Sequence, residues 1–284
     1  MRKYGRAIIG ESLRSDVPLL NSQIEGVAPS IFALEKHDSR SDRYTYIPTI
    51  EILEVLRKNG FFPFFVAQSK SRVPGKELFT KHMIRLRTRF DVSEKETGEI
   101  ILINSCDGTS SYKLMSGVYR FVCQNGMVCG DTMNDFTVHH KGNIKNEVLE
   151  NAYNVSDNFE KTRWAIDKMK AIDLYPAEKE IFAESALMIK YGEDKAPIDS
   201  SKLLSIRRYE DRQDNSLWGT LNVVQENVIK GGLRGRTSTN KKTSTREVKS
   251  IDNNVKLNKA LWSLADKMAE LKAGMSNTIN KVNA

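Results

Sequence analysis

The hydrophobic period of this chain changes once, and that change limits the folds open to it. In residues 81–90, KHMIRLRTRF, apolar side chains alternate with polar ones, which is typical of a half-buried strand. From about Lys145 onward the apolar spacing becomes three, four and seven, which predicts helices. Strands followed by helices indicate an α+β fold rather than a doubly wound α/β fold. We therefore expect an antiparallel β-meander packed against helices, with a helical C-terminal part.

Turn and capping signals place the individual elements. Thr49 can cap a helix that Gly60 ends, and a long helix after Lys145 is expected to kink near Ser156. Strands are expected in 44–47, 61–68, 82–90, 99–105, twice within 112–131, and in 136–140, and helices in 50–59, 145–172, 176–191, 216–230 and 252–271. The expected organisation is an N-terminal segment (1–35), an α+β core (36–230), a basic flexible loop (231–250) and a C-terminal helix (251–284).

Composition favours an anionic partner. The 284 residues are 39% hydrophobic, and the net charge is +8 with an isoelectric point of about 9.2. Nucleic acid is the first candidate for such a charge, and an acidic membrane surface is the second. No apolar run approaches the length of a membrane span, and three cysteines suit a reducing compartment, so we expect a cytoplasmic protein that does not enter a membrane.

The motifs of common enzymes are missing from the sequence. It contains neither G-x-x-x-x-G-K-[ST] nor G-x-G-x-x-G, and no G-x-S-x-G. His139 and His140 are adjacent, so on a strand they would face opposite sides and could not chelate one ion together. We expect a protein without catalytic residues, cofactor or metal.

Three arginines on one face of the 82–90 strand are the first candidate site. Arg85, Arg87 and Arg89 repel one another, so we expect the face to be open and neutralised by a polyanion. Arg40 and Arg43 flank Tyr44 and Tyr46, whose rings could stack on bases.

The segment 231–250 is the second candidate site. Its cations stand among glycines and Ser and Thr hydroxyls, which is the donor chemistry that contact with phosphate groups requires. Across both sites the candidate nucleic-acid-binding residues are Arg85, Arg87, Arg89, Arg40, Arg43, Tyr44, Tyr46, Arg234, Arg236, Lys241, Lys242 and Arg246.

Several segments resemble a known family. KHDSRSDRYTYIPT, EIILINSCDGTSSYKL, YRFVCQNGMVCGD and VVQENVIKGGLRGR are similar to segments of the proteins of domain of unknown function 932, over roughly residues 28–265. The resemblance implies a phage, prophage or plasmid origin. In topology alone, a basic meander followed by a long helix also resembles single-strand annealing proteins of the Rad52-like and phage recombinase group.

The leading hypothesis is a protein that binds single-stranded DNA as a homo-oligomer, in a ring or filament, and promotes annealing or protection. One alternative is an interaction protein that inhibits a host defence or replication protein through its basic surface. Another is a metal-dependent nuclease built on His139, His140 and nearby aspartates.

Overall fold

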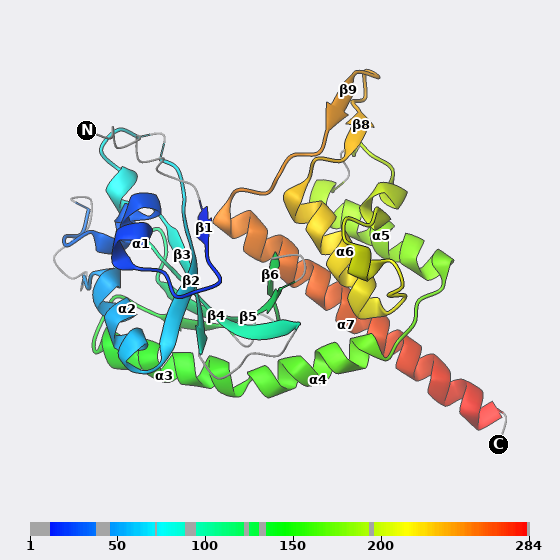
Figure 1. Ribbon diagram of the computed structural model, residues 1–284, viewed down its shortest axis with the longest axis horizontal. Coiled ribbons are helices and arrows are strands. Elements are labelled where there is room, and N and C mark those ends of the chain that lie inside the picture. The colour runs from blue at the N-terminus through cyan, green and yellow to red at the C-terminus, as the bar shows by residue number, and fades with distance from the viewer. Residues whose placement is uncertain are drawn as a thin grey trace. The chain divides into compact units, whose positions relative to one another are not determined.

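The chain divides into two compact units, which are described separately. Unit 1 comprises residues 1–119 and 132–159, and unit 2 comprises residues 120–131 and 160–284. The computed structural model describes residues 12–37, 46–71, 73–88, 95–121, 125–130, 135–192 and 196–282. Figure 1 shows the elements and their labels.

Unit 1 is built on an antiparallel sheet, as the alternating pattern predicts. The strand order is β1-β2-β3-β4-β5, and β7 pairs with β5. The register places Val66 of β2 opposite Ile84 of β3, and Ile84 opposite Leu102 of β4. The strands are β1 (Ser12–Arg14), β2 (Phe61–Gln68), β3 (His82–Thr88), β4 (Glu96–Asn104), β5 (Tyr112–Arg120) and β7 (Phe136–Val138).

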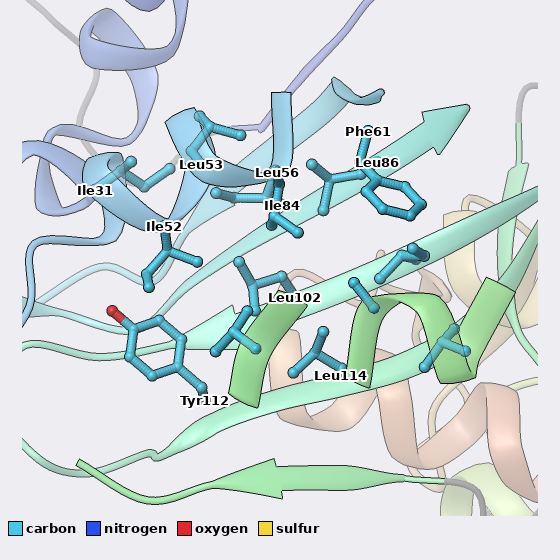
Figure 2. Packing of buried hydrophobic residues seen from close by; sticks show 14 of the residues in the cluster. Ile31, Ile52, Leu53, Leu56, Phe61, Ile84, Leu86, Leu102, Tyr112 and Leu114 are labelled. Atoms are coloured by element: carbon cyan, nitrogen blue, oxygen red, sulfur yellow. The ribbon is translucent and has the colours of Figure 1, made fainter. Parts of the chain in front are cut away.

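Helices cover one face of this sheet and form the core of unit 1. They are α1 (Asn21–Val27), the short 3-10 helix η1 (Pro29–Phe32), α2 (Thr49–Lys58) and α3 (Ile144–Asp157). Unit 1 also contains a second 3-10 helix, η2 (Glu77–Phe79). Figure 2 shows Ile52 and Leu56 of α2 packed over Ile84 of β3 and Leu102 of β4, and all four are at most 1% exposed. The α+β class is therefore confirmed.

The opposite face of the sheet is also buried. Met83 of β3 and Ile101 and Ile103 of β4 point away from the helix-covered face, and each is at most 3% exposed. A strand buried on both faces reads as a continuous apolar run rather than an alternating one, which is what residues 100–103 show.

Unit 2 is mainly helical. Its helix α6 is buried on nearly all sides, and Trp218 of α6 meets Trp262 of α7 edge to face at 6.3 Å between ring centroids. The elements are α4 (Phe159–Lys170, whose first residue lies in unit 1), α5 (Pro176–Tyr191), η4 (Ser200–Leu204), η5 (Tyr209–Asp211), α6 (Leu217–Lys230), α7 (Ile251–Val282) and the short strands β6 (Asn125–Val128), β8 (Arg234–Arg236) and β9 (Lys242–Ser244). Within the described ranges, every helix is too short or too polar to cross a lipid bilayer.

Several expected boundaries differ from the observed ones. The N-terminal segment is not separate, because Ile24 and Ile31 are fully buried in the core of unit 1. The expected single core of residues 36–230 is divided between the two units. The break near Ser156 is confirmed, since α3 ends at Asp157 and α4 begins at Phe159. Of the short strand expected at 44–47, residues 44 and 45 lie outside the described part, and residues 46 and 47 are not in a strand.

The segment 231–250 is not a structureless loop. It contains β8 and β9, which pair as an antiparallel hairpin. Short strands rich in Gly, Ser, Thr and Lys carry no apolar alternation, and backbone hydrogen bonds rather than side-chain burial hold this hairpin together. The pattern that reveals strands elsewhere in the chain is therefore missing here.

Candidate nucleic-acid interface

The face of β3 that carries Arg85 and Arg87 is buried, so the expected open arginine face is wrong for these two residues. Their side chains are 3% and 5% exposed, and both contact Glu99 of β4, whose side chain is fully buried. Arg85 Nη1 lies 3.1 Å from one Glu99 oxygen, and Arg87 Nε lies 2.9 Å from the other. An internal carboxylate therefore already neutralises part of their charge. Arg89 lies outside the described residues.

The neighbouring strand held the signal that would have corrected this prediction. Residues 100–103 are apolar on both faces of β4, and β3 pairs with β4 along this stretch. A strand covered on both faces lies inside the protein, so we would expect the adjoining part of β3 to be covered as well. The three-arginine alternation alone shows which side chains share a face but not what covers that face.

Of the candidate residues in the 40–46 segment, the structure describes Tyr46. Arg40, Arg43 and Tyr44 lie outside the described part of the chain. Tyr46 is half-buried; its hydroxyl donates to the carbonyl oxygen of Ala33, and the same oxygen lies 3.4 Å from Cys106 Sγ. Tyr46 is therefore tied to the interior of unit 1.

Burial raises the pKa of the Cys106 thiol to about 11, so this cysteine is a small core residue rather than a nucleophile.

The remaining candidate cations belong to the basic hairpin, which we define as residues 233–246. Figure 1 shows β8 and β9 extending beyond α5 and α6 of the same unit. The register places Arg234 opposite Ser244, Gly235 opposite Thr243, and Arg236 opposite Lys242. In the connecting turn Asn240 adopts a positive φ of 62°, and its backbone carbonyl and side-chain oxygens accept hydrogen bonds from Arg236 Nη1.

The two faces of the basic hairpin differ in composition. Residues opposite one another in an antiparallel pair share a face, so Arg234, Arg236, Lys242 and Ser244 lie on one side and Gly235 and Thr243 on the other. A Cβ atom at Gly235 would lie 1.7 Å from the carbonyl oxygen of Pro197, which accepts a 2.8 Å hydrogen bond from the Arg236 amide. The glycine face is therefore seated on residue 197, and the cationic face is turned away from it.

The base of the hairpin is fixed to the end of α6. Gly231 has φ of 61°, and a Cβ atom there would lie 2.6 Å from the backbone of Arg246. Buried Thr245 accepts a hydrogen bond from Gly232 N, donates its own amide to Leu233 O, and accepts from Leu233 N through its hydroxyl. These bonds hold the two ends of the hairpin side by side.

The five cations of the hairpin are exposed: Arg234, Arg236, Lys241, Lys242 and Arg246. None of them forms an ion pair with a carboxylate in the described ranges. The nearest acid in sequence, Glu247, is exposed and lies 3.8 Å from Lys249. Like charges gathered on one face without internal neutralisation form an electrostatic site for anions.

The cations just outside the hairpin are used internally. Glu226 of α6 is 2% exposed and accepts hydrogen bonds from Arg208 and Lys230, each at 2.8 Å. Burial alone would raise the pKa of Glu226, but these two hydrogen bonds outweigh burial and leave its pKa below the usual value. Arg207 donates to Asn227 and to the carbonyl of Gly231, so it supports the hairpin rather than extending the anion site.

A buried polar network in unit 1 was not expected from the sequence. His82 Nδ1 lies 2.8 Å from Ser30 Oγ, and its Nε2 lies 3.0 Å from Thr49 Oγ1. Asn104 donates to the same Thr49 oxygen and accepts from His140 Nε2 at 3.1 Å. Because burial lowers the pKa of His82 to about 3, its imidazole is neutral near pH 7. Full burial makes this network a structural one.

The histidines assemble no metal centre in the described part of the chain. His139 is exposed, whereas His140 is buried and bonded to Asn104. No group of three His, Cys, Asp or Glu side chains is placed to hold a metal ion within the described ranges. Asp131, one of the aspartates near the histidines, lies outside them.

Comparison with known proteins yields one family. A family model described as a domain of unknown function (DUF932) matches residues 36–262. The UPF0380 proteins YafZ and YfjQ of Escherichia coli (strain K12) are each 46% identical to the chain over 254 residues, which cover 89% of this chain and 93% of each relative. No solved structure matches the chain.

Proposed function

Because the chain belongs to the DUF932 family, whose description names no activity, we propose a function from the charged surface itself: the chain binds nucleic acid through the basic hairpin. Single-stranded DNA is the ligand we propose first. One observation carries the proposal: five exposed cations form no ion pair with a described carboxylate, and Gly235 turns three of them toward one side.

The chemistry of the hairpin suits a phosphate backbone. Arginine forks bind phosphate oxygens with two parallel hydrogen bonds, and lysines add point charge. The exposed hydroxyls of Thr237, Ser238 and Thr239 supply neutral donors at the turn. Such contacts position a strand without reading its sequence, so binding is expected to depend weakly on base order.

The length of the hairpin sets how many phosphates it can reach. Three-residue strands span roughly 10 Å at about 3.3 Å per residue. The three cations that share the outer face along this distance, Arg234, Arg236 and Lys242, can each meet one phosphate of a bound strand. The turn and the flanking Arg246 extend the reach, so we expect about three to five neutralised phosphates.

The experiment is a titration of a labelled single-stranded oligonucleotide with the full chain at about 0.1 M salt. The test variant is Arg234→Gln/Arg236→Gln/Lys242→Gln. The matched control is Lys58→Gln/Lys113→Gln/Lys141→Gln, which removes three exposed cations of unit 1 and lowers the net charge from +8 by the same three charges, to +5. We expect the test variant to lose roughly 100-fold in affinity, since each contact contributes about fivefold at this salt concentration.

Three outcomes separate the possible partners. Equal affinity of the test and control variants would contradict the role of the hairpin. Equal binding of duplex and single strand would make the phosphate backbone, rather than the single strand, the ligand. Absence of binding to any oligonucleotide, together with nuclease-resistant pull-down of an acidic protein, would favour the interaction-protein alternative.

Annealing by a ring or filament stays a prediction, which imaging with and without the oligonucleotide can test.

A further inference from the structure

We propose that Tyr209 is a base-stacking residue beside the basic hairpin, and that an unpaired base of a single-stranded nucleic acid packs on its ring. Such a contact rests on the proposed function, because the hairpin supplies the grip on the phosphate backbone. Stacking would make the site prefer a single strand to a duplex, a choice that phosphate contacts alone do not make.

The ring of Tyr209 is open to solvent. Tyr209 is 77% exposed, more than any other large apolar or aromatic residue in the described ranges. Arg212 Cζ lies 5.3 Å from the centroid of the ring, so the guanidinium covers part of it and the rest is accessible. Single exposed aromatic residues are common on protein surfaces, so the way this ring is held and what lies beside it decide its role.

Two ion pairs with buried carboxylates hold the short helix η5, on which Tyr209 lies. On one side, Arg208 Nη2 contacts Glu226 of α6 at 2.8 Å, and the side chain of Glu226 is 2% exposed. On the other side, Asp211 accepts from Arg120 Nη2 at 2.7 Å, and its side chain is 1% exposed. All of these residues belong to unit 2. The ring is therefore presented at a fixed place, which lowers the entropy lost when a base binds.

The residues just before Tyr209 contact the base of the basic hairpin. Arg207 donates to the carbonyl oxygen of Gly231, which caps the C-terminus of α6. Arg208 and Lys230 donate to the same carboxylate oxygen of Glu226. Helix η5 therefore begins beside the point where the chain enters the hairpin, and one nucleic-acid strand can contact both.

The charges around the ring favour a base over a phosphate at this position. Arg212 forms no ion pair with a carboxylate in the described part of the chain, and the exposed acid Glu210 offsets its charge. The ring thus adds little net charge, and the hairpin cations supply the attraction for phosphate. Every base has a flat face that can stack on an aromatic ring, but in a duplex those faces are already stacked on neighbouring bases.

The test compares two tyrosine variants of the full chain. Tyr209→Leu removes the ring and keeps an apolar side chain. Tyr175→Leu is the matched control, because Tyr175 is 72% exposed and Lys272 Nζ lies 5.0 Å from the centroid of its ring. Tyr175 precedes α5, whereas Lys190 near the other end of that helix contacts the carbonyl of Val228, close to the hairpin. Each protein is titrated with a thymidine oligonucleotide, with an abasic strand of equal length, and with a duplex.

We expect Tyr209→Leu to lose about 5-fold to 150-fold in affinity for the thymidine strand, which corresponds to the stacking of one base. Its affinity for the abasic strand and the duplex should match that of the wild type. Its salt dependence should have the wild-type slope, because no charge is lost. Tyr209→Phe, which keeps the ring, and Tyr175→Leu should both bind as the wild type does. Because Tyr209 is exposed, its variants should unfold at the wild-type temperature.

The outcomes separate this role of Tyr209 from the function of the hairpin. Equal losses of Tyr209→Leu for the thymidine and abasic strands would show a disturbed hairpin and overturn the stacking role. Wild-type binding by Tyr209→Leu, with weakened binding by Arg234→Gln/Arg236→Gln/Lys242→Gln, would overturn stacking and leave the proposed function standing. If that hairpin variant instead binds as its own control does, the proposed function fails. Absence of binding to every oligonucleotide would overturn both.

Discussion

At the scale of single residues, Gly235 decides where the cations of the hairpin point. Its hydrogen atom occupies the only space left beside the Pro197 carbonyl, since a Cβ atom would lie 1.7 Å from that oxygen. The glycine in the sequence RGR is therefore a packing requirement of this site. Gly235 carries no charge, so it contributes to the interface by orienting the cations of the hairpin.

Gly235→Ala is predicted to weaken oligonucleotide binding although the charge stays unchanged. The added methyl group must push the hairpin from residue 197, which breaks the hydrogen bond from Arg236 N to Pro197 O. Faster hydrogen exchange of the Arg236 amide should accompany the loss of affinity. Gly26→Ala is the matched control, because a Cβ atom at Gly26 meets nothing within 4 Å. Wild-type affinity and exchange in Gly235→Ala would contradict the proposed seating.

His82 is predicted to make unit 1 sensitive to acid. Its folded pKa of about 3 lies below the unfolded value of 6.5, so between these values the unfolded chain binds a proton that the folded chain does not. Stability therefore falls as pH decreases from about 6.5 toward 3, by up to about 1.4 kcal/mol per pH unit. Urea unfolding at several pH values measures this slope.

A pair of histidine variants isolates the cause of that slope. His82→Gln should be less stable than the wild type at pH 7.5, because Ser30 and Thr49 lose their imidazole partner, and should show a flatter pH profile. His139→Gln, at an exposed position, should keep the wild-type profile. A profile for His82→Gln as steep as that of the wild type would assign the acid sensitivity to other groups.

At the scale of elements, β3 and β4 depend on one carboxylate. Glu99→Gln keeps the shape of the side chain but removes the negative charge that Arg85 and Arg87 both contact. Removing one partner of a buried ion pair typically costs about 3–5 kcal/mol, and we expect a loss of that size in the free energy of unfolding. Glu51→Gln breaks the exposed pair with Lys145 and should cost less than about 1 kcal/mol. Equal small losses in both variants would show that Glu99 is not the main counter-charge.

The elements with a clear period were predictable from the sequence, and the hairpin was not. Phe61–Gln68 and the break near Ser156 were expected where they occur, because burial on one face fixes the spacing of apolar residues. The strands β8 and β9 are held by backbone pairing and by Gly235, neither of which leaves a periodic signal. The burial of Arg85 required knowledge of which strand lies beside β3.

At the scale of the whole molecule, the net charge of +8 overstates the charge available to a partner. Cations such as Arg85, Arg208 and Lys230 are matched by buried carboxylates. The basic hairpin is the group of exposed, unmatched cations that the proposed function uses. Net charge alone therefore favours an anionic partner, whereas the distribution of ion pairs selects the surface that would meet it.

The salt dependence of oligonucleotide binding tests this selection most directly, because its slope counts neutralised phosphates. If all five hairpin cations contact phosphates, the logarithm of the binding constant should fall with the logarithm of salt concentration with a slope of about −3.5. The slope should be about −1.4 for Arg234→Gln/Arg236→Gln/Lys242→Gln and should stay near −3.5 for Lys58→Gln/Lys113→Gln/Lys141→Gln. Identical slopes for the two triple variants would contradict the hairpin as the phosphate-binding element.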